Sequence, residues 1–242
     1  MHPARIAELL QPFLHEANDQ RLTTNDKFYQ DISTYIDMLQ HWNARINLTA
    51  IRNEEEIVTR HFGESLFAAS HLFPEVYPLY PVPSVVKDFD FDFDSANDQR
   101  RTTNDRVADL GSGAGFPGIP IKLWAPNIAL TLIESNQKKA TFLREVARAL
   151  TLTDINIQNA RAQTLPPSTF DVVTLRAVER MAKALPVAAN LLAPSGLLAL
   201  LIASSQLETT RSALPNLAWQ PPIPIPQSKS RLLLLGRQEP GM

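Results

Sequence analysis

The stretch Asp109-Leu110-Gly111-Ser112-Gly113-Ala114-Gly115-Phe116-Pro117-Gly118 decides the fold class of this chain. It holds four of the eight glycines in 242 residues, so glycine is concentrated at one point. An apolar run at 107–110 precedes it, and a helical pattern over 119–124 follows it. Glycines between a strand and a helix let backbone amides approach a ligand, and the helix N-terminus favours negative charge there. The stretch predicts a ligand-binding turn in an α/β sheet.

The residues around and after this turn alternate between strand and helix patterns. Apolar runs predict strands at 107–110, 128–133, 155–158, 172–175, 197–202 and 232–235, and helical spacing predicts helices at 119–124 and 138–150. Such alternation is typical of a mostly parallel sheet with helices on both faces. The nearly continuous apolar runs fit strands that are buried on both sides.

The residues before the turn have a different pattern. Apolar stripes predict helices at 4–17, 26–42 and 54–73. Residues 74–106 begin with closely spaced prolines and continue with a Phe-Asp alternation, and a polar decapeptide at 18–27 recurs at 97–106. Proline at this density opposes helix and central strand alike. We therefore predict a helical extension over 1–75 packed on the main domain, a polar and proline-rich insertion or linker over 76–105, and a cofactor-binding domain over 106–242.

Composition excludes several classes of function. Cysteine is absent, which excludes disulfides, thiolate metal sites and cysteine nucleophiles, and we expect no metal. No run of about eighteen apolar residues is present, and the first residues lack the pattern of a secretory signal, so we expect a cytoplasmic protein without a membrane partner. The formal charge is −2, so RNA binding would depend on a local basic patch.

The turn is compatible with two cofactors. Gly113, Gly115 and Gly118 satisfy the G-x-G-x-x-G pattern of dinucleotide sites, which supports an NAD-dependent oxidoreductase. Asp109, two residues before the first glycine, favours S-adenosyl-L-methionine (AdoMet), as in methyltransferases with this type of sheet. Glu134 follows the second strand, where a carboxylate accepts both ribose hydroxyls. Glu134 locates the ribose in either case, so the residues alone leave both cofactors open.

Several motifs outside the turn make a family resemblance specific. They are Trp42-Asn43 with Asn47-Leu48-Thr49, Arg60-His61 with Glu64-Ser65-Leu66, the continuation of the turn through Phe116-Pro117-Gly118-Ile119-Pro120, residues 135–143, Arg161-Ala162 before Phe170-Asp171, and Leu175-Arg176-Ala177. With these motifs, which span roughly 26–73 and 106–205, the chain resembles the RsmG (GidB) family of 16S ribosomal RNA guanine-N7 methyltransferases.

The resemblance implies a fold, a cofactor, a substrate and a set of site residues. The fold is α/β, a Rossmann-like class I methyltransferase sheet with an N-terminal helical extension. The cofactor is AdoMet, and the partner is 16S ribosomal RNA or the small ribosomal subunit. The candidate cofactor-binding residues, including those of the turn, are Asp109, Gly111, Gly113, Phe116, Glu134, Ser135, Asn136, Ala162, Gln163 and Arg176. The candidate substrate-binding residues are Asn47, Arg60 and His61.

The chain departs from the family pattern at two positions. Gln163 stands where an acid is common, and Ser204 stands at the end of the fifth strand where the family usually has lysine. The second departure puts a substrate-contacting cation in doubt. If another lysine has replaced it, Lys183 is the nearest candidate in sequence after the fourth strand.

Methylation at guanine N7 explains why no acid–base pair is evident. N7 carries a lone pair and no proton, so the reaction needs in-line placement rather than a general base. Arg176, at the carboxyl end of a strand, is our candidate catalytic residue, and the alternative is an ordinary ion pair at a strand end. His61 is either a substrate contact or a packed helix residue, and Arg60 with Arg45 and Arg52 forms either an RNA-binding patch or a solvated face.

Three functions compete at this point. The first is AdoMet-dependent methylation of a guanine N7 in small-subunit ribosomal RNA, and the second is an NAD-dependent oxidation. The third is a non-catalytic RNA-binding role in ribosome assembly, in a protein that kept the fold.

Overall fold

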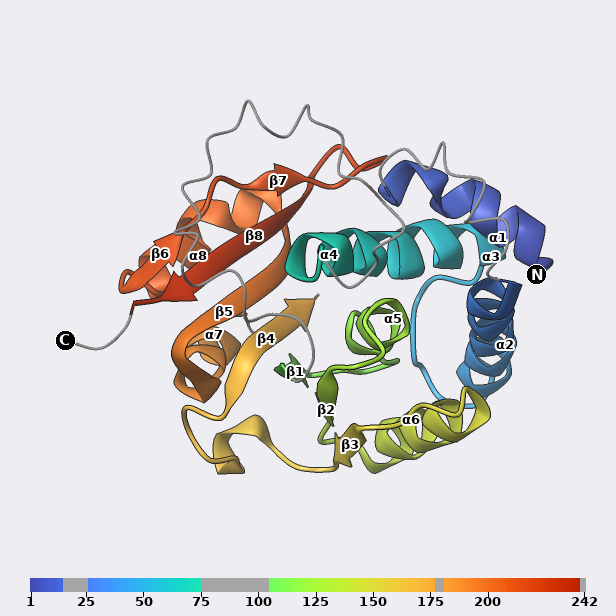
Figure 1. Ribbon diagram of the computed structural model, residues 1–242, viewed down its shortest axis with the longest axis horizontal. Coiled ribbons are helices and arrows are strands. Elements are labelled where there is room, and N and C mark those ends of the chain that lie inside the picture. The colour runs from blue at the N-terminus through green and yellow to red at the C-terminus, as the bar shows by residue number, and fades with distance from the viewer. Residues whose placement is uncertain (15–25, 75–104, 177–180, 240–242) are drawn as a thin grey trace.

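A computed structural model describes residues 1–14, 26–74, 105–176 and 181–239 (Figure 1). Residues 76–104 of the insertion predicted at 76–105, and most of both decapeptide copies, lie outside the described residues. The end of the first copy begins helix α2, and the end of the second copy begins strand β1, so each copy joins a regular element.

One mixed sheet organises the fold. Its strands are β1 (Arg106–Leu110), β2 (Ala129–Ile133), β3 (Ile155–Gln158), β4 (Phe170–Arg176), β5 (Leu192–Ala203), β6 (Leu217–Trp219), β7 (Ile223–Pro224) and β8 (Arg231–Gln238). The order is β3-β2-β1-β4-β5-β8-β6, and β7 pairs with β8. Strands β1 to β5 are parallel, whereas β8 is antiparallel to β5. The strand order reverses direction between β1 and β4, and such a switch point is where open α/β sheets bind ligands.

Helices follow or precede these strands. They are α1 (Pro3–Leu10), α2 (Asp26–Asn43), α3 (Glu54–Glu56), a π-helix (Ile57–Gly63), α4 (Glu64–Leu72), α5 (Gly118–Trp124), α6 (Gln137–Ala149), α7 (Met181–Leu191) and α8 (Leu207–Ala213). The helix predicted at 4–17 ends at Leu10, where a 3-10 turn over Gln11–Phe13 replaces it, and residues 15–17 lie outside the described residues. Pro12 has no amide hydrogen for the next α-helical bond. The predicted helix at 54–73 is continuous in direction but contains the π-helix.

Two apolar clusters cover the two faces of the sheet. One joins the N-terminal helices and α5 and α6 to Val107, Leu130 and Leu132, and the other joins α7 to Ala108 and Val173 on the opposite face. Figure 1 shows α4 beside α5 and α2 beside α6. The N-terminal helices therefore pack as part of one layer. The α/β fold class with a parallel-dominated sheet and N-terminal helices is confirmed.

Tyr35 of α2 connects the N-terminal helices to the glycine turn. Its hydroxyl donates to the carbonyl of Ala114, and its ring is fully buried. Gly115 makes this approach possible, because its φ is +89° and a Cβ there would overlap the Tyr35 hydroxyl and lie 2.7 Å from Ile119 Cδ1. The side chain of α2 thus packs directly on the backbone of the turn.

We expect Gly115→Ala to lower the free energy of unfolding by about 2–4 kcal/mol, because overpacking adds to the strain of a left-handed backbone. Gly113→Ala is the matched control, since its φ is +57° and the nearest atom to its Cβ would be 3.8 Å away. The control should lose only about 1–2 kcal/mol. Urea unfolding measures both, and equal losses would show that the contact with Tyr35 is unimportant.

Candidate functional site

The glycine turn lies at the carboxyl end of β1, beside the switch point. The φ angles of Gly111, Gly113 and Gly115 are +71°, +57° and +89°, a left-handed region that other residues enter at a cost. The amides of Gly111 and Ser112 donate to the carbonyl of Ile133 in β2. A Cβ at Gly111 would meet no atom within 4 Å. The hydrogen bonds to Ile133 therefore fix the turn to the end of β2. The space next to Gly111 is open.

Glu134 follows β2 and faces this turn. Its Oε2 accepts from the amide of Gly113 at 2.9 Å, and its Oε1 accepts from the amide of Asn136 at 2.7 Å. The residue is only 8% exposed. A carboxylate has about four acceptor positions, so each oxygen keeps one for a further donor. Glu134 therefore presents acceptors to a ligand while its own position is held by backbone amides.

Asp109 lies beneath the turn. Its Oδ2 accepts from the amide of Gly118 at 3.2 Å, and its Oδ1 accepts from the hydroxyl of Thr174 at 3.0 Å. Burial raises the pKa of Asp109 to about 6, although these hydrogen bonds oppose the shift. The carboxylate thus ties β1 to β4 and to the start of α5. Its predicted contact with a cofactor stays a prediction.

Phe116 is the centre of an aromatic cluster. Its ring stacks on Tyr35 with centroids 5.3 Å apart and on His61 at 4.8 Å, and its edge contact with Phe62 is 5.1 Å. The side chain is 6% exposed. The Phe116 ring therefore joins the glycine turn to α2 and to the π-helix. Because this ring is packed among other aromatic rings, the part of Phe116 left at the turn is its backbone.

The other candidate cofactor residues follow β2 and β3 at the same edge of the sheet. Ser135 and Asn136 are exposed, and the Asn136 side chain caps α6 by accepting from the amides of Lys138 and Lys139. Ala162 is buried in a 3-10 turn after β3, whereas Gln163 in the same turn is exposed. The structure therefore brings the ends of β1, β2 and β3 together around the turn, as parallel strands require.

Arg176, the last residue of β4, is held by the N-terminal helices. Its Nε and Nη2 donate to Oε2 of Glu64 at 3.3 and 3.1 Å, Nη2 also donates to the carbonyl of Arg60 at 2.6 Å, and Nη1 donates to His61 Nδ1 at 2.9 Å. The Arg176 and Glu64 side chains are 6% and 4% exposed. Arg176 thus makes a buried ion pair, and one Nη1 hydrogen is left without a partner among these contacts.

His61 lies on the π-helix, whose wider turn is typical of functional positions. Because Arg176 donates to Nδ1, the neutral ring carries its hydrogen on Nε2, which donates to Thr49 Oγ1 at 2.7 Å. Burial and then the neighbouring Arg176 lower the pKa of His61 to about 2. Both ring nitrogens are occupied, which supports a packed histidine that orients Arg176.

We expect His61 to remain neutral in the folded protein between pH 8 and 4, as read from its ring signals by NMR. In guanidinium the same residue should titrate near 6.5. The unfolded chain then binds a proton that the folded chain does not, so stability from this group is complete above pH 6.5. It falls by about 1.4 kcal/mol per pH unit below that value. Titration of His61 near pH 6 in the folded protein would contradict the burial argument.

Of the candidate substrate residues, Asn47 lies two positions before Thr49, which bonds to His61, and Arg60 directly precedes His61 on the π-helix. Asn47 is exposed in a turn that the buried Asn43 holds, because Asn43 Oδ1 accepts from the amides of Leu48 and Thr49. Arg60 is 43% exposed and pairs with Glu56 one helical turn earlier. Arg45 and Arg52 are exposed, and Arg52 donates to the carbonyl of Asn43.

Sequence reasoning missed the residues that surround Arg176. Glu64 appeared only as part of a motif. Tyr35, which packs on the glycine turn, lay within the helix predicted at 26–42 without being singled out. Arg231 begins β8 and lies opposite Ala203 of β5, and the amide of the exposed Ser204 donates to the carbonyl of Ser230. The cation near the end of β5 is therefore Arg231. Lys183, the candidate from sequence order, is exposed on α7.

The described part of the chain has no cluster of metal-ligating side chains. Within the same residues, no helix is long and apolar enough to cross a membrane.

Comparison with known proteins gives one family. The family model GidB, rRNA small subunit methyltransferase G, matches residues 28–76 and 93–218. Ribosomal RNA small subunit methyltransferase G of Xylella fastidiosa is 36% identical over 68% of this chain and 64% of that protein. The corresponding values are 38%, 61% and 52% for Exiguobacterium sp., and 31%, 81% and 73% for Bacillus pumilus. The chain spans less than two thirds of the length of the first two relatives.

Among solved structures, the [4+2]-cyclase SpnF is similar with a TM-score of 0.51 and 15% identity, over 58% of this chain and 76% of that one. At this identity the similarity concerns the fold only.

Proposed function

The chain belongs to the rRNA small subunit methyltransferase G (GidB) family, and on this premise we propose that it methylates guanine N7 in 16S ribosomal RNA with AdoMet as donor. The observation that carries the proposal is the glycine turn with open space at Gly111, next to the acceptors of Glu134. A cytoplasmic location follows from this substrate.

The residues at the carboxyl edge fit the cofactor. The amides of the turn and the left-handed Gly111 leave room for it, and Glu134 would accept hydrogen bonds from its ribose hydroxyls. Ser135, Asn136, Ala162 and Gln163 border the same edge, and Gly113 keeps Glu134 in place. Bound AdoMet supplies an electrophilic methyl group.

The role of Arg176 follows from its remaining donor. Guanine O6 is next to N7 and accepts hydrogen bonds, and guanidinium groups commonly contact this edge of guanine. We assign the free Nη1 hydrogen of Arg176 to O6, where it would orient the base and stabilise the charge that shifts as N7 is alkylated. No residue needs to remove a proton from N7.

Asn47 and Arg60 are proposed to contact the RNA, because Asn47 is exposed in the turn that leads to Thr49 and Arg60 is 43% exposed on the π-helix. His61 is assigned a positioning role, since its ring nitrogens are occupied by Thr49 and Arg176. An overall charge of −2 makes such local contacts necessary.

The experiment that tests the proposal uses small subunits from a strain that lacks this protein. We expect the purified chain to transfer labelled methyl from AdoMet to a single guanine, which mass spectrometry of the 16S RNA would map. Calorimetry should detect binding of AdoMet and none of NAD. A chain that binds NAD would support the oxidoreductase, and a chain that binds subunits without transferring methyl would support the assembly role.

A further inference from the structure

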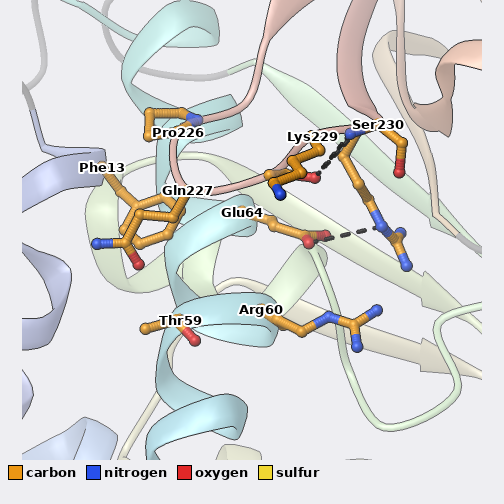
Figure 2. Close-up of a pocket in the computed structure, with 10 residues that line it drawn as sticks. Phe13, Thr59, Arg60, Glu64, Pro226, Gln227, Lys229 and Ser230 are labelled. Atoms are coloured by element: carbon orange, nitrogen blue, oxygen red, sulfur yellow. Dashed lines mark hydrogen bonds and ion pairs between the residues drawn. The ribbon is translucent and has the colours of Figure 1, made fainter.

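A pocket of about 260 Å³ lies beside the buried ion pair of Arg176 (Figure 2). One wall is the π-helix and the start of α4, and the other is the loop between β7 and β8. The lining residues used here are Thr59, Arg60, Glu64, Lys229, Ser230 and Arg231. Because Glu64 lines the pocket and also pairs with Arg176, the pocket adjoins the proposed site.

The pocket is positively charged. Arg60, Lys229 and Arg231 contribute three cations, and Glu64 is the one acid among the residues that line it. Oε2 of Glu64 is already bonded twice by Arg176, and Oε1 lies 3.7 Å from Arg231 Nε. Arg231 thus approaches Glu64 from the opposite wall of the pocket. The Glu64 charge is therefore largely compensated by Arg176, and the cations of the pocket exceed its anions.

The loop that carries two of these cations is built by its own hydrogen bonds. Ser228 Oγ accepts from the amide of Arg231 at 3.1 Å, and the amide of Ile225 donates to the Arg231 carbonyl at 3.0 Å. The carbonyl of Ser230 accepts from the amide of Ser204 at the end of β5. Lys229 and Ser230 are exposed, so their polar atoms are accessible from solvent. The cations are thus presented by a preformed loop.

We infer that this pocket binds a backbone phosphate of the RNA strand, with Lys229 and Arg231 as its ligands from the β7–β8 loop and Arg60 as its ligand from the π-helix. The inference rests on the proposed function. Guanidinium and ammonium groups with adjacent hydroxyls are the side chains that bind phosphate oxygens. Because Glu64 lines the pocket and pairs with Arg176, a phosphate bound here would lie next to the proposed site and set the register of the strand there.

The test compares Lys229→Gln and Arg231→Gln with Arg237→Gln. Arg237→Gln is the matched control, because it also removes one positive charge from β8. Arg237 pairs with Leu197 of β5, whereas Arg231 pairs with Ala203, so the two arginines lie at opposite ends of β8. Arg231 also contacts the buried Glu64, so Arg231→Gln changes the ion pair as well as the pocket. Lys229 is exposed, so Lys229→Gln removes a cation of the pocket without that second effect. Binding is measured to unmethylated small subunits and to a 20-nucleotide single-stranded RNA from 50 to 300 mM KCl at constant Mg²⁺.

We expect Lys229→Gln and Arg231→Gln each to weaken RNA binding about tenfold near 0.1 M salt and to reduce the slope of log K against log[salt] by about one. The control variant should keep wild-type values, and AdoMet affinity should be unchanged in all three. Unchanged RNA binding and slope in Lys229→Gln and Arg231→Gln would overturn the inference.

Two further arms separate the outcomes. If inorganic phosphate or guanosine monophosphate binds in an Arg231-dependent way while RNA binding does not depend on Arg231, the pocket takes a free phosphate and the RNA inference is wrong. If Lys229 and Arg231 are needed for RNA binding but the wild-type chain transfers no methyl, the inference stands and the proposed function fails.

Discussion

Arg176→Ala is expected to lower the free energy of unfolding by about 3 kcal/mol, because the buried Glu64 would lose the guanidinium that bonds it twice and keep only the longer contact with Arg231. Methyl transfer to small subunits should fall by about 10²–10³, the usual effect of removing a preorganised donor at a reacting group. Urea unfolding gives the first value. Single-turnover transfer at saturating AdoMet, at a temperature where the variant is folded, gives the second.

A double variant separates a contact with the base from a structural ion pair. Glu64→Gln with Arg176→Met removes both charges, and replacing a buried pair by neutral side chains restores much of the lost stability. We expect stability to recover while methyl transfer stays low. Recovery of both would mean that Arg176 is an ordinary strand-end ion pair with no contact to the substrate.

Ser204→Ala is the variant with which Arg176→Ala is compared, and we expect it to have little effect on methyl transfer. The Ser204 side chain is exposed, and its contact with the β7–β8 loop is made by its backbone amide. We therefore expect nearly wild-type transfer in Ser204→Ala, far above that of Arg176→Ala. Equal losses in both variants would place Ser204 in the site and would contradict this view of Arg231 as the cation at the end of β5.

Gly111→Val is expected to abolish AdoMet binding in calorimetry, because a branched side chain would project into the open space next to the turn. The φ of +71° adds strain, so stability should fall by about 1–2 kcal/mol as well. Gly111→Asn is the control for strain, since asparagine tolerates this backbone region but still fills the space. It should recover stability without recovering binding.

Glu134→Ala tests the second part of the proposed cofactor site, the carboxylate that faces the glycine turn. Loss of hydrogen bonds to a charged acceptor should weaken AdoMet binding by about 1.5–3 kcal/mol. Wild-type affinity in this variant would remove the ribose role from Glu134. Normal AdoMet affinity in Gly111→Val would show that the cofactor does not use the space beside the turn.

The strands of the central sheet could be predicted because buried parallel strands are short apolar runs. All six predicted strands are present. Strand β5 begins earlier than expected, because Leu192 pairs with Phe170 of β4 across an irregularity before the apolar run starts at Leu197. Helix α7 was missed, since its sequence contains Pro186 and has alanines where a polar face is usual. The short strands β6 and β7 were also missed, because they depend on pairing with β8 rather than on their own pattern.

The sequence by itself determined the glycine turn, the acid after β2 and the family to which these residues point, because these features are local and their spacing carries the chemistry. The tertiary structure alone decided which side chains meet. Arg176 pairs with Glu64 112 positions away, and Tyr35 donates to Ala114 79 positions away. Periodicity indicates that a face is buried but not what it packs against. The partner of a buried charge therefore emerges only when the helices close over the sheet.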